Sequence, residues 1–134
     1  MSLHRLAAIL SIAAVVAAVV AGLLFIGSPS GQRALRFDER RVTDLRELSN
    51  AVKYRWTRRH EFTARAEDAI DGQILSRLPL DPESKRPYGY RVTGERTFEV
   101  CATFSRRSLE EAGDFWFHDA GNRCYSFELP KLPN

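Results

Sequence analysis

The first hydrophobic pattern along the chain is one uninterrupted apolar segment. Residues 6–26 (LAAILSIAAVVAAVVAGLLFI) contain no charged side chain and one serine. At about 1.5 Å per residue, a helix of this length crosses the roughly 30 Å hydrocarbon core of a bilayer. A cleavable signal peptide is the alternative, but its apolar region is usually about 7–15 residues and ends in small residues. We therefore predict a transmembrane helix over 6–26, after an N-terminal tail of residues 1–5.

A second pattern follows a predicted hinge at residues 27–33, where Pro29 and Gly31 disfavour a continuous helix. From about residue 34 to 60, apolar side chains recur at spacings of three and four, as on one face of an amphipathic helix. These residues are Val42, Leu45, Leu48, Val52 and Trp56. Such a face needs a partner surface. We expect this surface to be the domain's own sheet, with a partner protein or a lipid surface as the alternative.

Further along, a short helix is expected over 64–70, and alternation with a period of two then predicts β-strands. The apolar members are Tyr88, Tyr90 and Val92, then Phe98, Val100, Ala102 and Phe104. The apolar faces of these two strands lie on the same side of the sheet only if the loop between them has an odd number of residues. A loop of residues 94–96 satisfies this condition and pairs Tyr90 with Val100. Two more strands are predicted around 115–117 and 125–127, with Phe117 opposite Tyr125 and Phe115 opposite Phe127. The sequence thus predicts an α+β domain over 34–134, with the amphipathic helix packed on an antiparallel sheet of about four strands.

The two cysteines constrain the order of these strands. Cys101 and Cys124 both alternate with apolar residues, which places them together on the second face of the sheet. A disulfide needs Cα atoms about 4.4–6.8 Å apart. If the four strands followed one another in order, the third would separate the two strands that carry the cysteines by about 9.6 Å. A Cys101–Cys124 disulfide, which we predict, therefore requires the strand order 1-2-4-3, with a crossover at residues 105–114. An even cysteine count also suits an oxidising compartment.

The passage from loop to sheet resembles that of bacterial type IV pilin-like proteins, especially the major pseudopilins of type II secretion. The residues that carry the resemblance are Leu78-Pro79, Asp81-Pro82, Pro87-Tyr88 and Tyr90. The resemblance covers about the second half of the chain. It implies a pilin-like domain presented from the membrane, outside the cytoplasm, to a secretion, pilus or other envelope partner.

The N-terminus departs from the pattern of that family. It begins Met1-Ser2-Leu3-His4-Arg5, without the Gly-Phe processing site of prepilins, and has no acidic residue before Asp38. Cleavage by a prepilin peptidase is therefore not expected. The glutamate that usually assists head-to-tail packing of subunits in a filament is also absent.

The chain has a net charge of +3, and its charged residues are distributed unevenly along the sequence. Residues 33–60 carry nine Arg or Lys against four Asp or Glu, whereas residues 61–134 carry ten against thirteen. The basic stretch 53–60 interleaves cations with aromatic residues, but no nucleic-acid-binding motif surrounds it, and attraction to anionic lipids explains the same charges. We predict contact with the lipid bilayer and no nucleic-acid partner.

The arginines beside the apolar segment and the two cysteines predict opposite orientations of the protein in the membrane. Four follow it, namely Arg33, Arg36, Arg40 and Arg41, against Arg5 before it, and the positive-inside rule would place the domain in the cytoplasm. The resemblance and the paired cysteines favour the outside. We expect a single-pass protein of the inner (cytoplasmic) membrane with an extracytoplasmic C-terminal domain.

Little in the sequence points to catalysis. His118, Asp119 and Cys124 are close to one another in the sequence. A Cys–His pair can form a nucleophile or, with Cys101, part of the ligand shell of a metal. The CxxC spacing of zinc sites, a Gly-rich phosphate loop and a haem motif are all absent from the sequence. We predict no catalytic residue, metal or cofactor, and a structural or interaction role in the cell envelope. The alternative is a membrane-tethered metal or redox protein that uses Cys101, His118 and Cys124.

Overall fold

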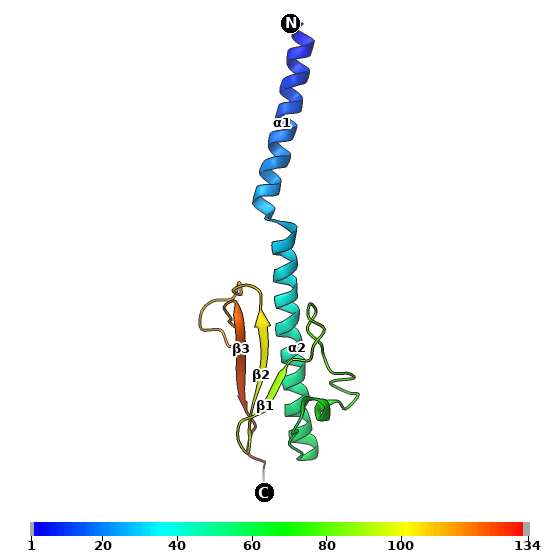
Figure 1. The fold of residues 1–134 in the computed structure, drawn as a ribbon, viewed down its shortest axis with the longest axis vertical. Helices are drawn as coiled ribbons and strands as arrows, with labels where there is room; N and C mark the ends of the chain where they lie inside the picture. Colours follow the sequence, from blue (N-terminus) through cyan, green and yellow to red (C-terminus); the bar gives the residue numbers. More distant parts are fainter. Residues whose placement is uncertain (1, 133–134) are drawn as a thin grey trace. The chain divides into compact units, whose positions relative to one another are not determined.

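Figure 1 shows the helices and strands of the chain. By their internal contacts the residues form two compact units, which divide between residues 33 and 34. The computed structural model describes residues 2–132. Its elements are helices α1 (Leu3–Ile26) and α2 (Pro29–Arg59), the 3-10 helix η1 (Ala66–Ala69), and strands β1 (Gly89–Val92), β2 (Thr97–Phe104) and β3 (Gly121–Glu128). An N-terminal helix followed by an α+β unit is the layout that the sequence predicts.

Helix α1 buries none of its residues within the structure. Its apolar side chains are open on all sides, with Leu24 79% and Phe25 93% exposed. Contact of such a surface with water costs about 25 cal/mol per Å² of apolar area, which favours an apolar environment around the helix. By length and composition α1 can span a membrane, and a signal sequence at this position would share both properties.

The interruption between the two helices is shorter than the predicted hinge at 27–33. Gly27 has a φ of 79°, which glycine adopts without steric cost, and α2 already begins at Pro29. Proline suits the first position of a helix because no partner is needed there for a backbone N–H. The Ser28 hydroxyl caps this end by accepting a hydrogen bond from the Gly31 N–H at 3.1 Å.

Within the second unit, one face of α2 packs on the sheet through the apolar residues that the sequence predicts. Leu45 and Val52 are fully buried, and they share one core with Phe98 and Val100 of β2. Trp56, at the end of the same stripe, is half-buried, and its indole N–H donates to the Pro130 carbonyl at 2.8 Å. The prediction that the helix packs on the domain's own sheet is confirmed.

The sheet is antiparallel, with the order β1-β2-β3. Tyr90 pairs with Val100, as the sequence predicts, and the Thr93 N–H donates to the Thr97 carbonyl across the turn at 2.9 Å. The apolar side chains of β2 therefore face α2 together with Tyr90. The odd-loop prediction is confirmed.

The predicted strand at 115–117 is wrong, and the four-stranded sheet and the order 1-2-4-3 are wrong with it. This segment makes local turns instead: the Asp114 N–H donates to Glu111 and the Phe117 N–H donates to Asp114, at 3.1 and 3.0 Å. Within the described residues the sheet has three strands, and the strand that carries Cys124 is β3, directly beside β2.

The expected short helix over 64–70 is a single 3-10 turn, η1. The Asp68 carboxylate accepts a hydrogen bond from the Arg65 N–H at 3.1 Å, which closes the turn at its start. The Asp71 carboxylate then accepts the N–H groups of Gln73 and Ile74, each at 2.9 Å. These side-chain bonds satisfy the backbone locally and compete with a longer helix.

We predict that Leu48→Ala lowers the free energy of unfolding by about 2–5 kcal/mol, because Leu48 is 1% exposed and its loss leaves a cavity between α2 and the sheet. The matched control is Leu109→Ala, which deletes the same atoms from a side chain that is 82% exposed and should cost less than about 0.5 kcal/mol. Urea unfolding of the full chain in detergent, followed by tryptophan fluorescence, measures both. Equal losses would contradict the described core.

Candidate functional site

The densest polar cluster in the domain surrounds Arg41, which is 3% exposed. Its guanidinium donates to Asp38 at 2.8 Å, to Asp81 at 2.5 and 3.2 Å, and to Glu83 at 2.9 Å. It also donates to the Ser105 hydroxyl at 3.0 Å. These partners come from α2, from the loop before β1 and from the residue after β2. One side chain therefore joins three separate segments. We call these five residues the Arg41 cluster.

Two carboxylates of the Arg41 cluster also fix the backbone of the loops. Asp38 accepts the N–H groups of Ser105 and Arg106, each at 2.9 Å. Asp81 accepts those of Glu83 and Ser84, at 3.0 and 2.7 Å. Because these acceptors bind both a guanidinium and backbone donors, they position the loops on either side of the sheet's end.

Charge in the Arg41 cluster is stabilised by these bonds. Burial raises the pKa of Asp81, but the hydrogen bonds from Arg41 and from the Ser84 and Glu83 N–H groups outweigh it and lower the pKa to about 2. Hydrogen bonding to Asp81 raises the pKa of Arg41 above its ordinary value. Arg41 thus occupies the position at which the carboxylates converge, and the arrangement is that of a structural ion cluster.

A third buried carboxylate, Asp44, lies one turn further along α2 and is 1% exposed. It accepts the Tyr88 hydroxyl at 2.8 Å and forms an ion pair with Arg40, whose Nε lies 2.8 Å from it. Burial and the hydrogen bond to Asp44 raise the pKa of Tyr88. The phenol therefore remains a donor, and it attaches the segment before β1 to the helix.

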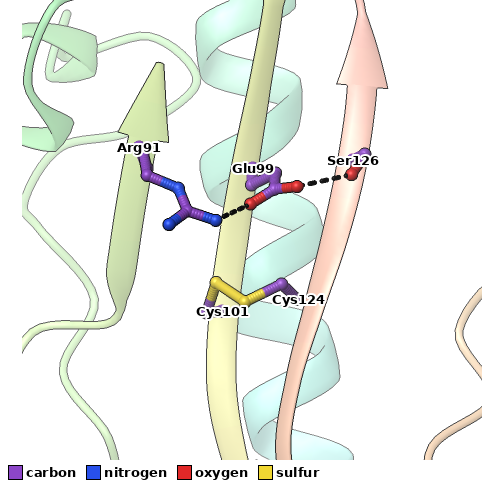
Figure 2. The surroundings of a disulfide bond; sticks show 5 residues. All are labelled: Arg91, Glu99, Cys101, Cys124 and Ser126. Atoms are coloured by element: carbon purple, nitrogen blue, oxygen red, sulfur yellow. Dashed lines mark hydrogen bonds and ion pairs between the residues drawn. A yellow bond between two sulfur atoms is a disulfide. The ribbon is translucent and has the colours of Figure 1, made fainter. Parts of the chain in front are cut away.

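On the sheet face that points away from α2, Cys101 and Cys124 form a disulfide (Figure 2). They lie directly opposite each other on β2 and β3, with Cα atoms 4.0 Å apart. Beside them, Glu99 accepts hydrogen bonds from Arg91 at 2.5 Å and from Ser126 at 3.0 Å. Polar and covalent contacts thus link all three strands on this face.

The disulfide also bears on metal binding. Among residues 2–132, the one group of potential metal ligands within 4.8 Å of one another is Glu99, Cys101 and Cys124. Metal binding by cysteine requires the free thiolate, and here the two sulfur atoms are bonded to each other.

His118 lies apart from the cysteines. Its ring stacks on Phe104 at 3.6 Å between centroids, and the residue is 3% exposed. Phe104 belongs to the face of β2 that packs on α2, whereas Cys101 points to the other face. The structure therefore does not bring together Cys101, His118 and Cys124, the set considered as an alternative metal or redox site.

An aromatic cluster lies along β3, of which the sequence analysis expected the pair Phe115 and Phe127 but not Trp116. It consists of Phe115, Trp116, Tyr125 and Phe127. The ring centroids of Trp116 and Tyr125 lie 4.7 Å apart, and those of Phe115 and Phe127 lie 5.2 Å apart. Phe115 is 52% exposed, so the cluster is open to solvent on one side. The sequence feature that could have indicated this cluster is the run of three aromatic residues at 115–117, which the alternation pattern assigned to a strand.

Three cations lie over these rings. They are Arg46 over Trp116 at 5.3 Å, Lys53 over Phe127 at 4.2 Å and Arg123 over Tyr125 at 5.6 Å. Burial lowers the pKa of Lys53. The aromatic cluster and these three cations together are called the β3 patch. Cations over ring faces are attracted electrostatically, and a patch of this kind suits contact with another molecule.

A groove of about 270 Å³ lies between α2 and the connection that follows β2. Its lining includes Val42, Arg46, Arg107, Leu109 and His118. Small-molecule sites usually occupy about 300–1,000 Å³ and carry a few convergent polar groups. The groove is below that range, and its charged residues are of mixed sign.

Comparison of the chain with protein-family models, with curated proteins and with solved structures gives no match.

We predict that Asp81→Asn lowers the free energy of unfolding at pH 7 by about 2 kcal/mol. The pKa of Asp81 is about 2 when folded, against an ordinary 3.8, so its stabilisation is present above about pH 4 and is lost as the pH falls through about 2. Denaturant unfolding from pH 7 to 2 should show the difference between wild type and variant shrinking. The matched control is Asp119→Asn, at a side chain that is 72% exposed. A pH-independent difference would contradict this account.

We predict that Cys101→Ser combined with Cys124→Ser lowers the free energy of unfolding by about 3 kcal/mol, because the bond closes a loop with a sequence separation of 23. Reduction of the wild type should lower it by a similar amount and leave the variant unchanged. Thermal unfolding with and without reductant measures both effects. A wild type that is indifferent to reductant would show that the bond does not constrain the unfolded chain.

Proposed function

We propose that this protein is a single-pass, membrane-anchored structural or interaction module of the cell envelope. The observation that carries the proposal is the contrast between its two units. Helix α1 buries none of its apolar side chains, whereas the unit of residues 34–134 has its own core and ion cluster. A helix of this kind anchors, and a compact domain with satisfied internal charges is what it presents.

The proposed build is pilin-like, and it resembles especially the major pseudopilins of type II secretion. Supporting this are the residues of the loop-to-sheet passage and an amphipathic helix packed on an antiparallel sheet. In this chain the passage has a clear structural role, since Asp81 binds Arg41 and Tyr88 binds Asp44. Partners are expected among secretion-system or other envelope proteins, and no catalytic role is proposed.

The proposed location is the inner membrane with the domain outside the cytoplasm. The disulfide supports an oxidising compartment. Of the four arginines that favour the opposite orientation, Arg41 is buried against carboxylates and Arg40 pairs with Asp44. In the folded protein, Arg33 and Arg36 are the two of the four without an ion pair among residues 2–132, which weakens the charge argument for a cytoplasmic domain.

We predict that thiol labelling of intact bacterial cells expressing the full chain shows an extracytoplasmic, oxidised domain. A charged maleimide that is small enough to pass outer-membrane porins but does not cross the inner membrane should leave the wild type unmodified without reductant and add two tags after reduction. The protein should also remain in the membrane fraction after alkaline carbonate extraction, because α1 anchors it.

A control variant separates compartment from disulfide formation. It carries Cys101→Ser, Cys124→Ser and Leu109→Cys, which places one free thiol at a side chain that is 82% exposed. This thiol should be labelled in intact cells without reductant. Labelling only after the inner membrane is opened would place the domain in the cytoplasm, and release by carbonate would contradict anchoring.

A further inference from the structure

Strand β3 forms an edge of the sheet whose outward backbone groups are unpaired (Figure 1). The Leu129 N–H donates to the Arg96 carbonyl at 2.7 Å, so the odd-numbered residues of β3 face β2. The backbone N–H and C=O groups that point away from β2, toward the open edge, are therefore those of Asn122, Cys124, Ser126 and Glu128. Within residues 2–132, no backbone or side-chain group bonds to their N–H or C=O groups. An unpaired edge of this length is a template for another strand.

The segment 113–117 lies beside this edge without pairing to it. A hollow of about 430 Å³ separates the two, and its lining includes Phe115, Phe117, Cys124 and Ser126. The segment satisfies its own backbone through turns, and the Tyr125 hydroxyl holds the Trp116 carbonyl at 2.9 Å. The hollow therefore combines free strand hydrogen bonds with exposed aromatic surface, the two elements that strand addition uses for affinity and specificity.

The cations of the β3 patch lack ion-pair partners. Within residues 2–132, no carboxylate lies within ion-pair distance of Arg46, Lys53 or Arg123, whereas Arg91 on β1 pairs with Glu99. Arg123 lines the hollow together with Asp114, Lys53 lies over the Phe127 ring of β3, and Arg46 lines the groove beside α2. Lys53 is half-buried and has lost part of its hydration without gaining an anion. A ligand with carboxylates would supply the missing charge.

Two other occupants fit less well. A second copy of the chain, paired through a two-fold axis, would bring the same three cations onto each other, since an isologous contact opposes identical patches. Anionic lipid matches the charges but does not pair with the N–H and C=O groups of a strand edge.

We propose that the outer edge of β3 binds an extended, acidic segment of a partner protein as an added antiparallel or parallel strand. Its backbone pairs with Cys124 and Ser126. Its carboxylates lie on the side that faces α2, where they meet Lys53 and Arg123 of the β3 patch, and its apolar side chains lie on the opposite side, which carries the disulfide. This inference rests on the proposed role as an interaction module and names the site and the partner's chemistry.

The test is binding of a fluorescent seven-residue peptide of alternating Glu and Val to the full chain in phosphatidylcholine nanodiscs, read by fluorescence anisotropy. Two peptides serve as controls. A Lys–Val peptide of the same pattern should bind at least tenfold more weakly, because it meets like charges. The Glu–Val peptide N-methylated at alternate residues should also bind at least tenfold more weakly, since it keeps the charge and loses strand donors while the protein stays unchanged.

Protein variants locate the site. Ser126→Pro removes one outward N–H without touching the bonds to β2, and it should weaken binding at least tenfold. Ser126→Ala is its matched control, because both lose the hydroxyl that bonds Glu99 and only the proline loses the N–H. Lys53→Gln should weaken binding severalfold, whereas Arg77→Gln, the same charge change at an exposed distant residue, should leave it unchanged.

Several results would overturn the inference. These are no binding of the Glu–Val peptide, equal binding of its N-methylated form, or equal effects of Ser126→Pro and Ser126→Ala. Loss of peptide binding in phosphatidylglycerol nanodiscs would assign the patch to lipid, and a dimer broken by Ser126→Pro would assign it to a second copy. Thiol labelling and carbonate extraction test the membrane role separately, so a negative peptide result beside a normal labelling pattern overturns this inference alone.

Discussion

A buried guanidinium is the interaction on which the domain depends most. Arg41 gathers carboxylates from α2 and from the loop before β1, and it reaches the residue that follows β2. Removing the guanidinium would leave Asp38 and Asp81 buried without their shared counter-charge, which typically costs about 3–5 kcal/mol. The described residues form three strands with one packed helix face, so these loops are held mainly by the Arg41 cluster and by the bond from Tyr88 to Asp44.

Features with a local period were predictable from the sequence. The stripe of α2 and the pairing of Tyr90 with Val100 follow from spacings of three and four, and of two, that burial imposes on helices and strands. The prediction of a strand at 115–117 was wrong because three alternating residues are too few to distinguish a strand from a turn. Its backbone bonds are decided by Asp114 and by the Tyr125 hydroxyl, which lies outside the segment.

The candidate sites divide in the same way. Alternation placed Cys101 and Cys124 on one face, where the structure joins them. In the Arg41 cluster, helical spacing links only Asp38 to Arg41, whereas Asp81 and Ser105 lie 40 and 64 positions from Arg41 and no periodicity links them to it. The burial of His118 against Phe104 depends on the path of the whole connection after β2, as does the contact between the Trp116 and Tyr125 rings. Such contacts are tertiary, and sequence spacing alone does not determine them.

The position of the disulfide has a mechanical consequence. It joins the two longest strands near their centres, at directly opposed residues. A tensile load applied to β3 would be shared by a covalent link and by the ladder of hydrogen bonds, so β3 cannot slide past β2 or peel away beyond Cys124 while the bond is intact. Force at this edge is therefore transmitted into β2 and, through its buried side chains, into α2.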